Sequence, residues 1–152
     1  MLFRSNNYGV TGPNVFLDCK AEAAISESGP HRHWTSGLLY DNVSTSDRIS
    51  IYQRKNYGRS KDAKPPYHLG HGWAAANCVL WNCTVAKLLL VESPPGAHNW
   101  AIGCKAGSFS SSGPERGGKR EAGSFESNNK PVAIRSLYEA QLAERMKKAK
   151  SL

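Results

Sequence analysis

The chain has 152 residues, which suits one domain of ordinary size with a buried core. Lysine and arginine outnumber aspartate and glutamate by 20 to 12, a formal net charge of +8, so a polyanion fits as a partner. No stretch approaches the ~18–20 consecutive apolar residues of a membrane-spanning helix, and residues 1–13 lack the apolar core of a secretory signal.

A strand-like pattern, in which a short apolar run ends in polar or small residues, recurs along the chain. The four copies are Val15-Phe16-Leu17-Asp18-Cys19, Leu38-Leu39-Tyr40-Asp41-Asn42, Val79-Leu80-Trp81-Asn82-Cys83 and Trp100-Ala101-Ile102-Gly103-Cys104. With Cys19, Asn42, Cys83 and Cys104 as anchors, the spacings are 23, 41 and 21 residues, and the 41 holds two coils or one coil with a long loop. Periods near 20 residues are typical of solenoids.

A second apolar piece follows most anchors, which predicts two strands per coil with a bend between them. These pieces are Ile25, then Ile49 with Ile51, then Leu88 to Leu90. The runs are rich in β-branched and aromatic residues, and Gly, Asn, Ser and Pro stand between them. We therefore expect an all-β chain, a short solenoid in the form of a right-handed parallel β-helix, over residues 1–130.

Three loops interrupt the predicted coils, and together they contain every histidine of the chain. They are Ser28 to Ser36, Asn56 to Gly72 and Ser93 to Asn99. Because each loop leads into an equivalent strand, coils in register would bring His31, His33, His68, His71 and His98 to one side. For any single histidine, packing in a turn is the competing interpretation.

The C-terminal part of the sequence changes character twice. Residues 107–129 are polar and glycine-rich, which predicts a surface loop. Residues 131–152 form a tail in which Ser136-Leu137-Tyr138-Glu139 has the form of a helix capping box, followed by good helix formers up to Lys150. Tyr138, Leu142 and Met146 share one helix face, so we expect this helix to cap the C-terminal end of the stack.

The four cysteines do not have the spacing of a zinc site. Cys19, Cys83 and Cys104 occupy equivalent places in their repeats, which favours buried free thiols over disulfides or metal ligation. Asn42-Val43-Ser44 and Asn82-Cys83-Thr84 match the glycosylation pattern, yet both asparagines belong to repeat strands, where bonding to a turn is favoured.

Four motifs carry a resemblance to a known family. GPHRHWTSGLLYDN, GHGWAAANCVLWNC, PPGAHNWAIGC and ESNNKPVAIRSLYEAQLAER resemble the C-terminal half of large secreted bacterial proteins of the pectate-lyase-like, right-handed parallel β-helix superfamily. The likeness spans roughly residues 10–146. It implies a polysaccharide-active protein that is secreted or periplasmic as part of a longer parent. Arg32 and His33 are exchanged relative to the family's usual order.

The loops carry residue types that suit elimination at a uronic acid. That reaction needs a cation to neutralise the carboxylate, a base for the C5 proton and an acid for the leaving oxygen. A histidine can serve as base near neutral pH without a metal. The candidate catalytic residues are His31, Arg32, His33 and His71. The candidate substrate-binding residues are Trp34, Lys55, Arg59, Tyr67, His68, Trp73 and His98.

Several alternatives stay open at this stage. Glycoside hydrolysis would need two carboxylates, for which Asp18 and Asp41 are candidates, although support of a turn is the favoured role for both. A non-catalytic carbohydrate-binding or assembly module would use the same tryptophans. A metal site is a third possibility, since His31 with His33, or His68 with His71, could offer two nitrogens; no third ligand stands at a diagnostic spacing, so we assign no metal and no cofactor. We expect no membrane association, and nucleic-acid binding is disfavoured because the sequence has no recognisable module for it. The first coil lies close to Met1, so we expect self-association through an exposed coil end.

Overall fold

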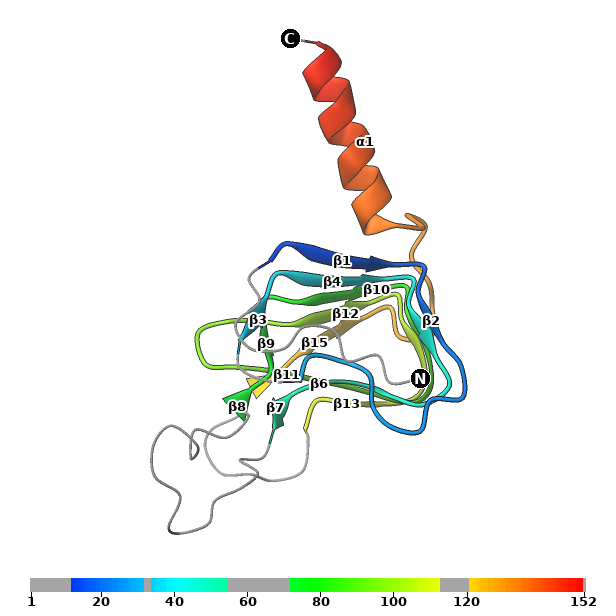
Figure 1. Ribbon diagram of the computed structural model, residues 1–152, viewed down its shortest axis with the longest axis vertical. Coiled ribbons are helices and arrows are strands. Elements are labelled where there is room, and N and C mark those ends of the chain that lie inside the picture. The colour runs from blue at the N-terminus through cyan, green and yellow to red at the C-terminus, as the bar shows by residue number, and fades with distance from the viewer. Residues whose placement is uncertain (1–11, 32–33, 55–71, 113–120, 152) are drawn as a thin grey trace.

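The computed structural model describes residues 12–31, 34–54, 72–112 and 121–151. Within these residues the protein is mostly β-strand, with parallel sheets and a single helix, α1 (Leu137–Lys150), near the C-terminus (Figure 1). This agrees with the predicted all-β class and the predicted C-terminal helix.

Five parallel strands form the first sheet, and their order in the sheet is their order in the chain. They are β1 (Asn14–Leu17), β4 (Leu38–Asp41), β10 (Val79–Trp81), β12 (Trp100–Ile102) and β15 (Ser124–Glu126). Strand β4 pairs directly with β10. The long interval between the second and third repeats therefore holds one turn of chain with an insertion and not two turns.

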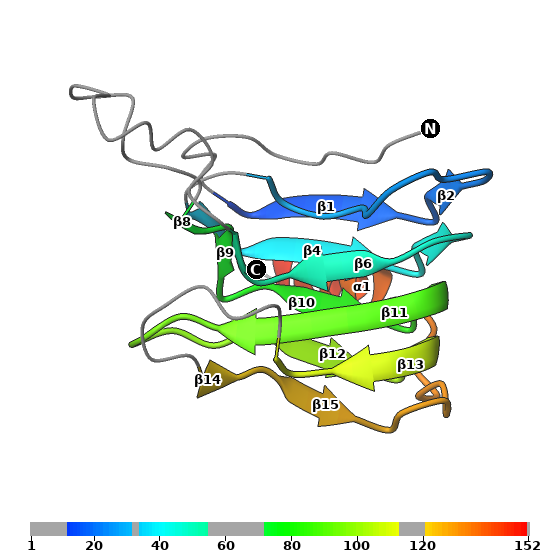
Figure 2. The same cartoon turned by 90° about the horizontal axis from the view of Figure 1, so that it is seen from below.

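The second sheet is built from the strands that follow those of the first. It contains β2 (Lys20–Ala21), β5 (Ser44–Thr45), β11 (Thr84–Ser93) and β13 (Lys105–Ser110), while β6 (Ile49–Ile51) and the antiparallel β14 (Glu121–Ala122) also pair with β11. Two small pairs complete the strands, β3 (Thr35–Ser36) with β9 (Ala75–Ala76) and β7 (Gln53–Arg54) with β8 (Gly72–Trp73). Figure 2 shows the successive strands stacked in layers.

The bend between the two sheets falls at one column of residues with left-handed backbone. Asp18, Asn42, Asn82, Gly103 and Ser127 have φ values of 52°, 54°, 49°, 68° and 54°. Asn, Asp and Gly adopt this region at the lowest steric cost, which explains their recurrence after each strand. Leu17 lies opposite Asp41, so Asp18 is equivalent to Asn42. The predicted alignment of Cys19 with Asn42 is therefore wrong by one residue.

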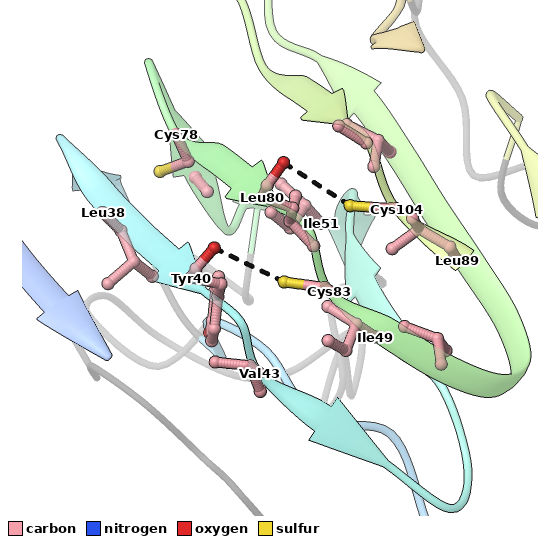
Figure 3. Packing of buried hydrophobic residues seen from close by; sticks show 14 residues of the cluster. Leu38, Tyr40, Val43, Ile49, Ile51, Cys78, Leu80, Cys83, Leu89 and Cys104 are labelled. Atoms are coloured by element: carbon pink, nitrogen blue, oxygen red, sulfur yellow. Dashed lines mark hydrogen bonds between the residues drawn. The ribbon is translucent and has the colours of Figure 1, made fainter. Parts of the chain in front are cut away.

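The core lies between the two sheets and is lined by stacked side chains (Figure 3). The first sheet contributes an inward column of paired residues: Phe16, Tyr40, Leu80, Ala101 and Phe125. Ile49 and Leu89 face it from the second sheet, and both are fully buried. Alternate residues of each strand point inward because side chains alternate across a sheet.

All four cysteines are free thiols, as predicted. Cys78, Cys83 and Cys104 are fully buried and Cys19 is half-buried. The thiols donate to carbonyls of the preceding layer: Cys83 Sγ lies 3.4 Å from Tyr40 O, and Cys104 Sγ lies 3.5 Å from Leu80 O. Burial raises the pKa of Cys78 to about 11. These side chains act as small apolar fillers whose S–H groups are satisfied.

Two predictions about apolar and polar segments are wrong. Ile25 is 84% exposed and belongs to no strand, so it is not a core piece of the first turn. Residues 107–129 are not a plain surface loop, because β13 extends to Ser110 and residues 124–126 form the fifth strand of the first sheet. Phe125 packs on Phe109 with ring centroids 5.7 Å apart, and both rings pack against the core, which gives this polar stretch an apolar contact.

Helix α1 does not cap the end of the stack, which corrects a second expectation. Residues 132–136 cross the outer side of the first sheet, and α1 then projects away from that outer side, at the level of β4 and β10 (Figures 1 and 2). No residue of α1 is buried, and Leu142 and Met146 are 38% and 54% exposed. The apolar face of Tyr138, Leu142 and Met146 predicted that the helix would be buried on that side. The start of the helix is instead fixed by hydrogen bonds of residues 132–138 to side chains of the first sheet. Ser136 Oγ accepts from Glu139 N at 3.1 Å, as the predicted cap requires.

Candidate functional site

The structure joins the ends of two of the predicted loops at a corner formed by Trp34 and Trp73. The Trp34 N–H donates to the Trp73 carbonyl at 3.0 Å, and the Thr35 N–H donates to Ala74 O at 3.1 Å. The parallel pairing of β3 with β9 continues this contact. The loop that begins at Ser28 and the loop that ends at Gly72 therefore reach the same edge of the molecule.

Trp34 has an unfavourable backbone conformation. Its φ is 45°, a backbone conformation that costs a bulky L residue ~1–3 kcal/mol and is concentrated at functional sites. Its side chain is 48% exposed, while Trp73 is half-buried. An exposed indole fixed at a corner offers a flat apolar surface to a ligand.

Buried polar groups fix the strand behind this corner. Gln53 pairs with Trp73 across the antiparallel strands β7 and β8. The Gln53 N–H donates to Glu92 Oε2 at 2.9 Å, and the Glu92 side chain is fully buried. The Tyr52 hydroxyl lies 3.4 Å from Glu27 Oε1. These contacts fix the position of the strand that pairs with Trp73.

His31 is half-buried in the segment that leads to Trp34. That segment is fixed at its start, since the Ser28 N–H donates to Arg48 O at 2.8 Å and the Ser50 N–H donates to Ser28 O at 3.0 Å. Seven of the predicted site residues lie outside the described residues: Arg32, His33, Lys55, Arg59, Tyr67, His68 and His71.

His98 occupies a different place, tied to the far end of strand β9. Its Nε2 lies 2.8 Å from Ser124 Oγ, its Nδ1 lies 3.2 Å from Ser93 Oγ, and its backbone N–H donates to Asn77 Oδ1 at 3.3 Å. Trp100 packs edge-on against the ring at 4.8 Å. Both ring nitrogens are engaged, so His98 holds the 93–99 loop against β15, which is the competing structural role.

Asp18 and Asp41 do not form the carboxylate pair that glycoside hydrolysis would need. Asp41 is fully buried, and its Oδ2 accepts from Ser136 Oγ at 2.7 Å and from Tyr138 N at 2.8 Å. Asp18 bonds to the Arg135 guanidinium at 2.5 Å. Both carboxylates hold the C-terminal segment, whereas the sequence favoured support of a turn as their role.

The two asparagines of the glycosylation-like motifs hold the same segment. Asn82 accepts from Val132 N at 2.9 Å and donates to Ile134 O at 3.0 Å, and Asn42 donates to Arg135 O at 2.8 Å. The sequence predicted that they bond to a turn near their own strand. The recurrence of these asparagines in equivalent repeats was the available signal, but nothing local in it indicated partners that lie 50 to 93 residues away.

Charged side chains beside the second sheet form ion pairs with one another. Asp47 is buried between Lys87 and Arg48, whose nitrogens lie 3.1 Å and 3.2 Å from its oxygens. Next to it, a groove of about 360 Å³ is lined by Lys20, Ser44, Ser46 and Thr84, among others. Lys20 pairs with Glu22, which also lines this groove, so the lining carries no net positive charge.

In the described part of the chain, no three His, Cys, Asp or Glu side chains gather as metal ligands would. Likewise, none of its helices has the length and apolar character needed to cross a membrane.

No family model, curated protein or solved structure matches this chain. The likeness to the pectate-lyase-like superfamily therefore stays a prediction.

Proposed function

We propose that the chain is a right-handed parallel β-helix that binds or acts on an acidic polysaccharide, in the manner of a polyuronate lyase. The strand order of the first sheet, which repeats the chain order through five strands, supports the β-helix. The net charge of +8 supports an acidic ligand.

The contact between Trp34 N and Trp73 O carries the proposal. It joins the described ends of two loops whose sequences hold most of the candidate chemistry. Arg32 and His33 directly precede Trp34 in the sequence, and His71 stands two residues before Trp73. Had these ends lain on opposite sides of the molecule, one ligand could not have used both loops.

The proposed roles follow from the chemistry of uronate elimination. An arginine pairs with the substrate carboxylate and makes the C5 proton more acidic, and a histidine removes that proton. The exposed Trp34 indole stacks on the apolar face of a sugar ring. His98 is not among the proposed acids or bases, because Ser93 and Ser124 engage its ring.

A non-catalytic carbohydrate-binding module is the second candidate. It is favoured by the same exposed indole, which would bind a sugar without any base nearby. A glycoside hydrolase is disfavoured at the pair Asp18 and Asp41, since both carboxylates are occupied by the C-terminal segment.

The experiment uses a panel of polyuronates, with a neutral glucan as the ligand control. Binding is measured by calorimetry, and elimination by the absorbance of the unsaturated product. We expect Trp34→Ala to weaken polyuronate binding about tenfold, equal to about 1.4 kcal/mol. Arg32→Ala and His71→Ala should weaken binding or turnover while stability stays within about 0.5 kcal/mol.

Ile25→Ala is the matched control, because Ile25 is an exposed apolar residue that belongs to neither loop. It should bind as the wild type does. Binding without any unsaturated product would favour the non-catalytic module. Polyuronate binding that survives all three site substitutions, or equal binding of the neutral glucan, would refute the site.

A further inference from the structure

Two apolar surfaces of this protein have no cover among the described residues. One is a groove on the outer side of the first sheet, lined by Val15, Leu39 and Val79 and flanked by the start of α1; we call it the outer groove. The other is the pair Leu142 and Met146 on α1, which we call the helix stripe. Neither takes part in the proposed polysaccharide site.

The outer groove follows from the register of the first sheet. Val15 lies opposite Leu39, and Leu39 lies opposite Val79, so three outward aliphatic side chains form a continuous column. Residues 132–136 cross the sheet at Trp81, whose indole N–H donates to Ile134 O at 2.9 Å. They do not cover Val15, Leu39 and Val79, which stay half-buried. The groove has a volume of about 410 Å³ and is bounded on the helix side by Tyr138, Gln141 and Arg145, among others.

The helix stripe lies on an element with little burial. Helix α1 has 14 residues, none of them buried. The Tyr138 N–H in its first turn donates to Asp41, and Gln141 and Arg145 border the outer groove. An isolated helix of this length is marginal in water, and most helices in proteins are stabilised by packing of an apolar face. Leu142 and Met146, exposed by 38% and 54%, are the side chains available for that packing.

We propose that α1 of each chain docks in the outer groove of a second copy, which gives a dimer with two-fold symmetry. One chain holds both complementary surfaces, so the contact is made twice in an isologous pair. A helix of this length is about 21 Å long and about 10 Å wide. Each contact then covers about 200 Å² on each of two surfaces, so two contacts bury on the order of 800 Å² in total, the size of a weak interface.

The charges of α1 favour an antiparallel crossing of the two helices. Glu139 lies in the first turn, whereas Lys147, Lys148 and Lys150 lie in the last. A two-fold axis across the helices places the basic end of each beside the acidic start of the other, and it separates the two lysine clusters. A parallel pair would bring like charges together.

The test is analytical ultracentrifugation of the full chain from about 1 to 500 μM. We expect a monomer–dimer equilibrium in the micromolar range, since an interface of this size binds weakly. Leu142→Glu and Leu39→Glu should each raise the dissociation constant about tenfold or more, because each places a charge in an apolar contact. Ala140→Glu, which adds the same charge on the opposite face of α1, is the matched control and should leave it unchanged.

A crosslinking experiment keeps the inference testable if a variant folds poorly. A Leu142→Cys chain and a Leu39→Cys chain are mixed under mild oxidation, and a disulfide between the two chains is expected. An Ala140→Cys chain should not crosslink to the Leu39→Cys chain. A protein that stays monomeric at 500 μM, or a dimer that Leu142→Glu and Leu39→Glu leave intact, overturns the proposal. Binding of a monomer to anionic lipid vesicles through Leu142 would assign the helix stripe to a lipid surface instead.

Discussion

Single residues at the bends explain why this chain can turn from one sheet to the other. Asn42 and Asn82 tolerate left-handed backbone and also present an amide to the C-terminal segment. Gly103 stands in the same column, and a Cβ built there would lie 2.2 Å from Asn82 Oδ1. The smallest residue is therefore required beside the amide that binds Val132.

Asp47 is a buried carboxylate whose charge is balanced by two cations. Burial raises the pKa of this carboxyl, but hydrogen bonds and attraction from Lys87 and Arg48 outweigh burial, so its pKa lies below the usual 3.8. A carboxyl whose pKa is lower in the folded chain stabilises the fold above the unfolded pKa. That stability is lost as the pH falls through the folded value.

We therefore expect Asp47→Asn to destabilise the protein at about pH 7, with a difference from the wild type that shrinks as the pH falls below 3.8. Urea unfolding at a series of pH values measures this. Glu22→Gln is the control, because Glu22 pairs with Lys20 on the exposed surface, where ion pairs contribute little. A difference between wild type and Asp47→Asn that is independent of pH would contradict the expectation.

At the scale of elements, the C-terminal segment acts as a strap across the first sheet. It is held at Asn82, Asn42 and Asp41 in succession, and α1 begins where Asp41 accepts from the Tyr138 N–H at 2.8 Å. The carboxylate near the first helical N–H groups also favours the helix electrostatically. The position of α1 is thus set by side chains of the strands beneath it.

Two substitutions at Asn82 separate its backbone role from its side-chain role. Asn82→Gly keeps the left-handed φ but removes the hydrogen bonds to the strap. The N–H of the half-buried Val132 then loses its acceptor, which lowers the free energy of unfolding by about 1–3 kcal/mol. Asn82→Ala loses the same bonds and adds about 1–2 kcal/mol of backbone strain. Urea unfolding of both variants should rank wild type above Gly and Gly above Ala. Equal stability of the Gly and Ala variants would show that the φ carries no cost.

At the scale of the whole molecule, the stacked layers share one core, and the thiols report on it. Cys78, Cys83 and Cys104 lie in three different strands or turns and are all fully buried. Burial raises the pKa of Cys78 and of Cys83, so neither forms the reactive thiolate near neutral pH. Access of a reagent to these sulfurs requires the layers to separate.

Thiol labelling followed by mass spectrometry should show one fast site and three slow ones. At about pH 8 we expect Cys19, which is half-buried, to react first, and the three buried thiols to react together at the rate of global unfolding. Labelling in denaturant, where all four should react alike, is the control. A buried thiol that reacts as fast as Cys19 would show that its layer opens independently.

Local patterns in the sequence determined the strand content, the buried thiols and the helix cap at Ser136. Each depends on residues near one another in the chain: alternating apolar side chains make a strand, and a serine three residues before a free N–H makes a cap. The same reasoning identified the loops around Trp34 and Trp73 as candidates for one site.

Tertiary structure alone decided the register, the fifth layer and the place of α1. A shift of one residue, such as that between Cys19 and Asp18 as the partner of Asn42, changes no local pattern and is settled by pairing between strands. Residues 124–126 form a strand because β12 offers them bonding partners and Phe109 offers Phe125 a neighbour. The apolar face of α1 did not predict where the helix lies. The bonds that orient the helix come from Asp41, Asn42 and Asn82, which are far away in the sequence.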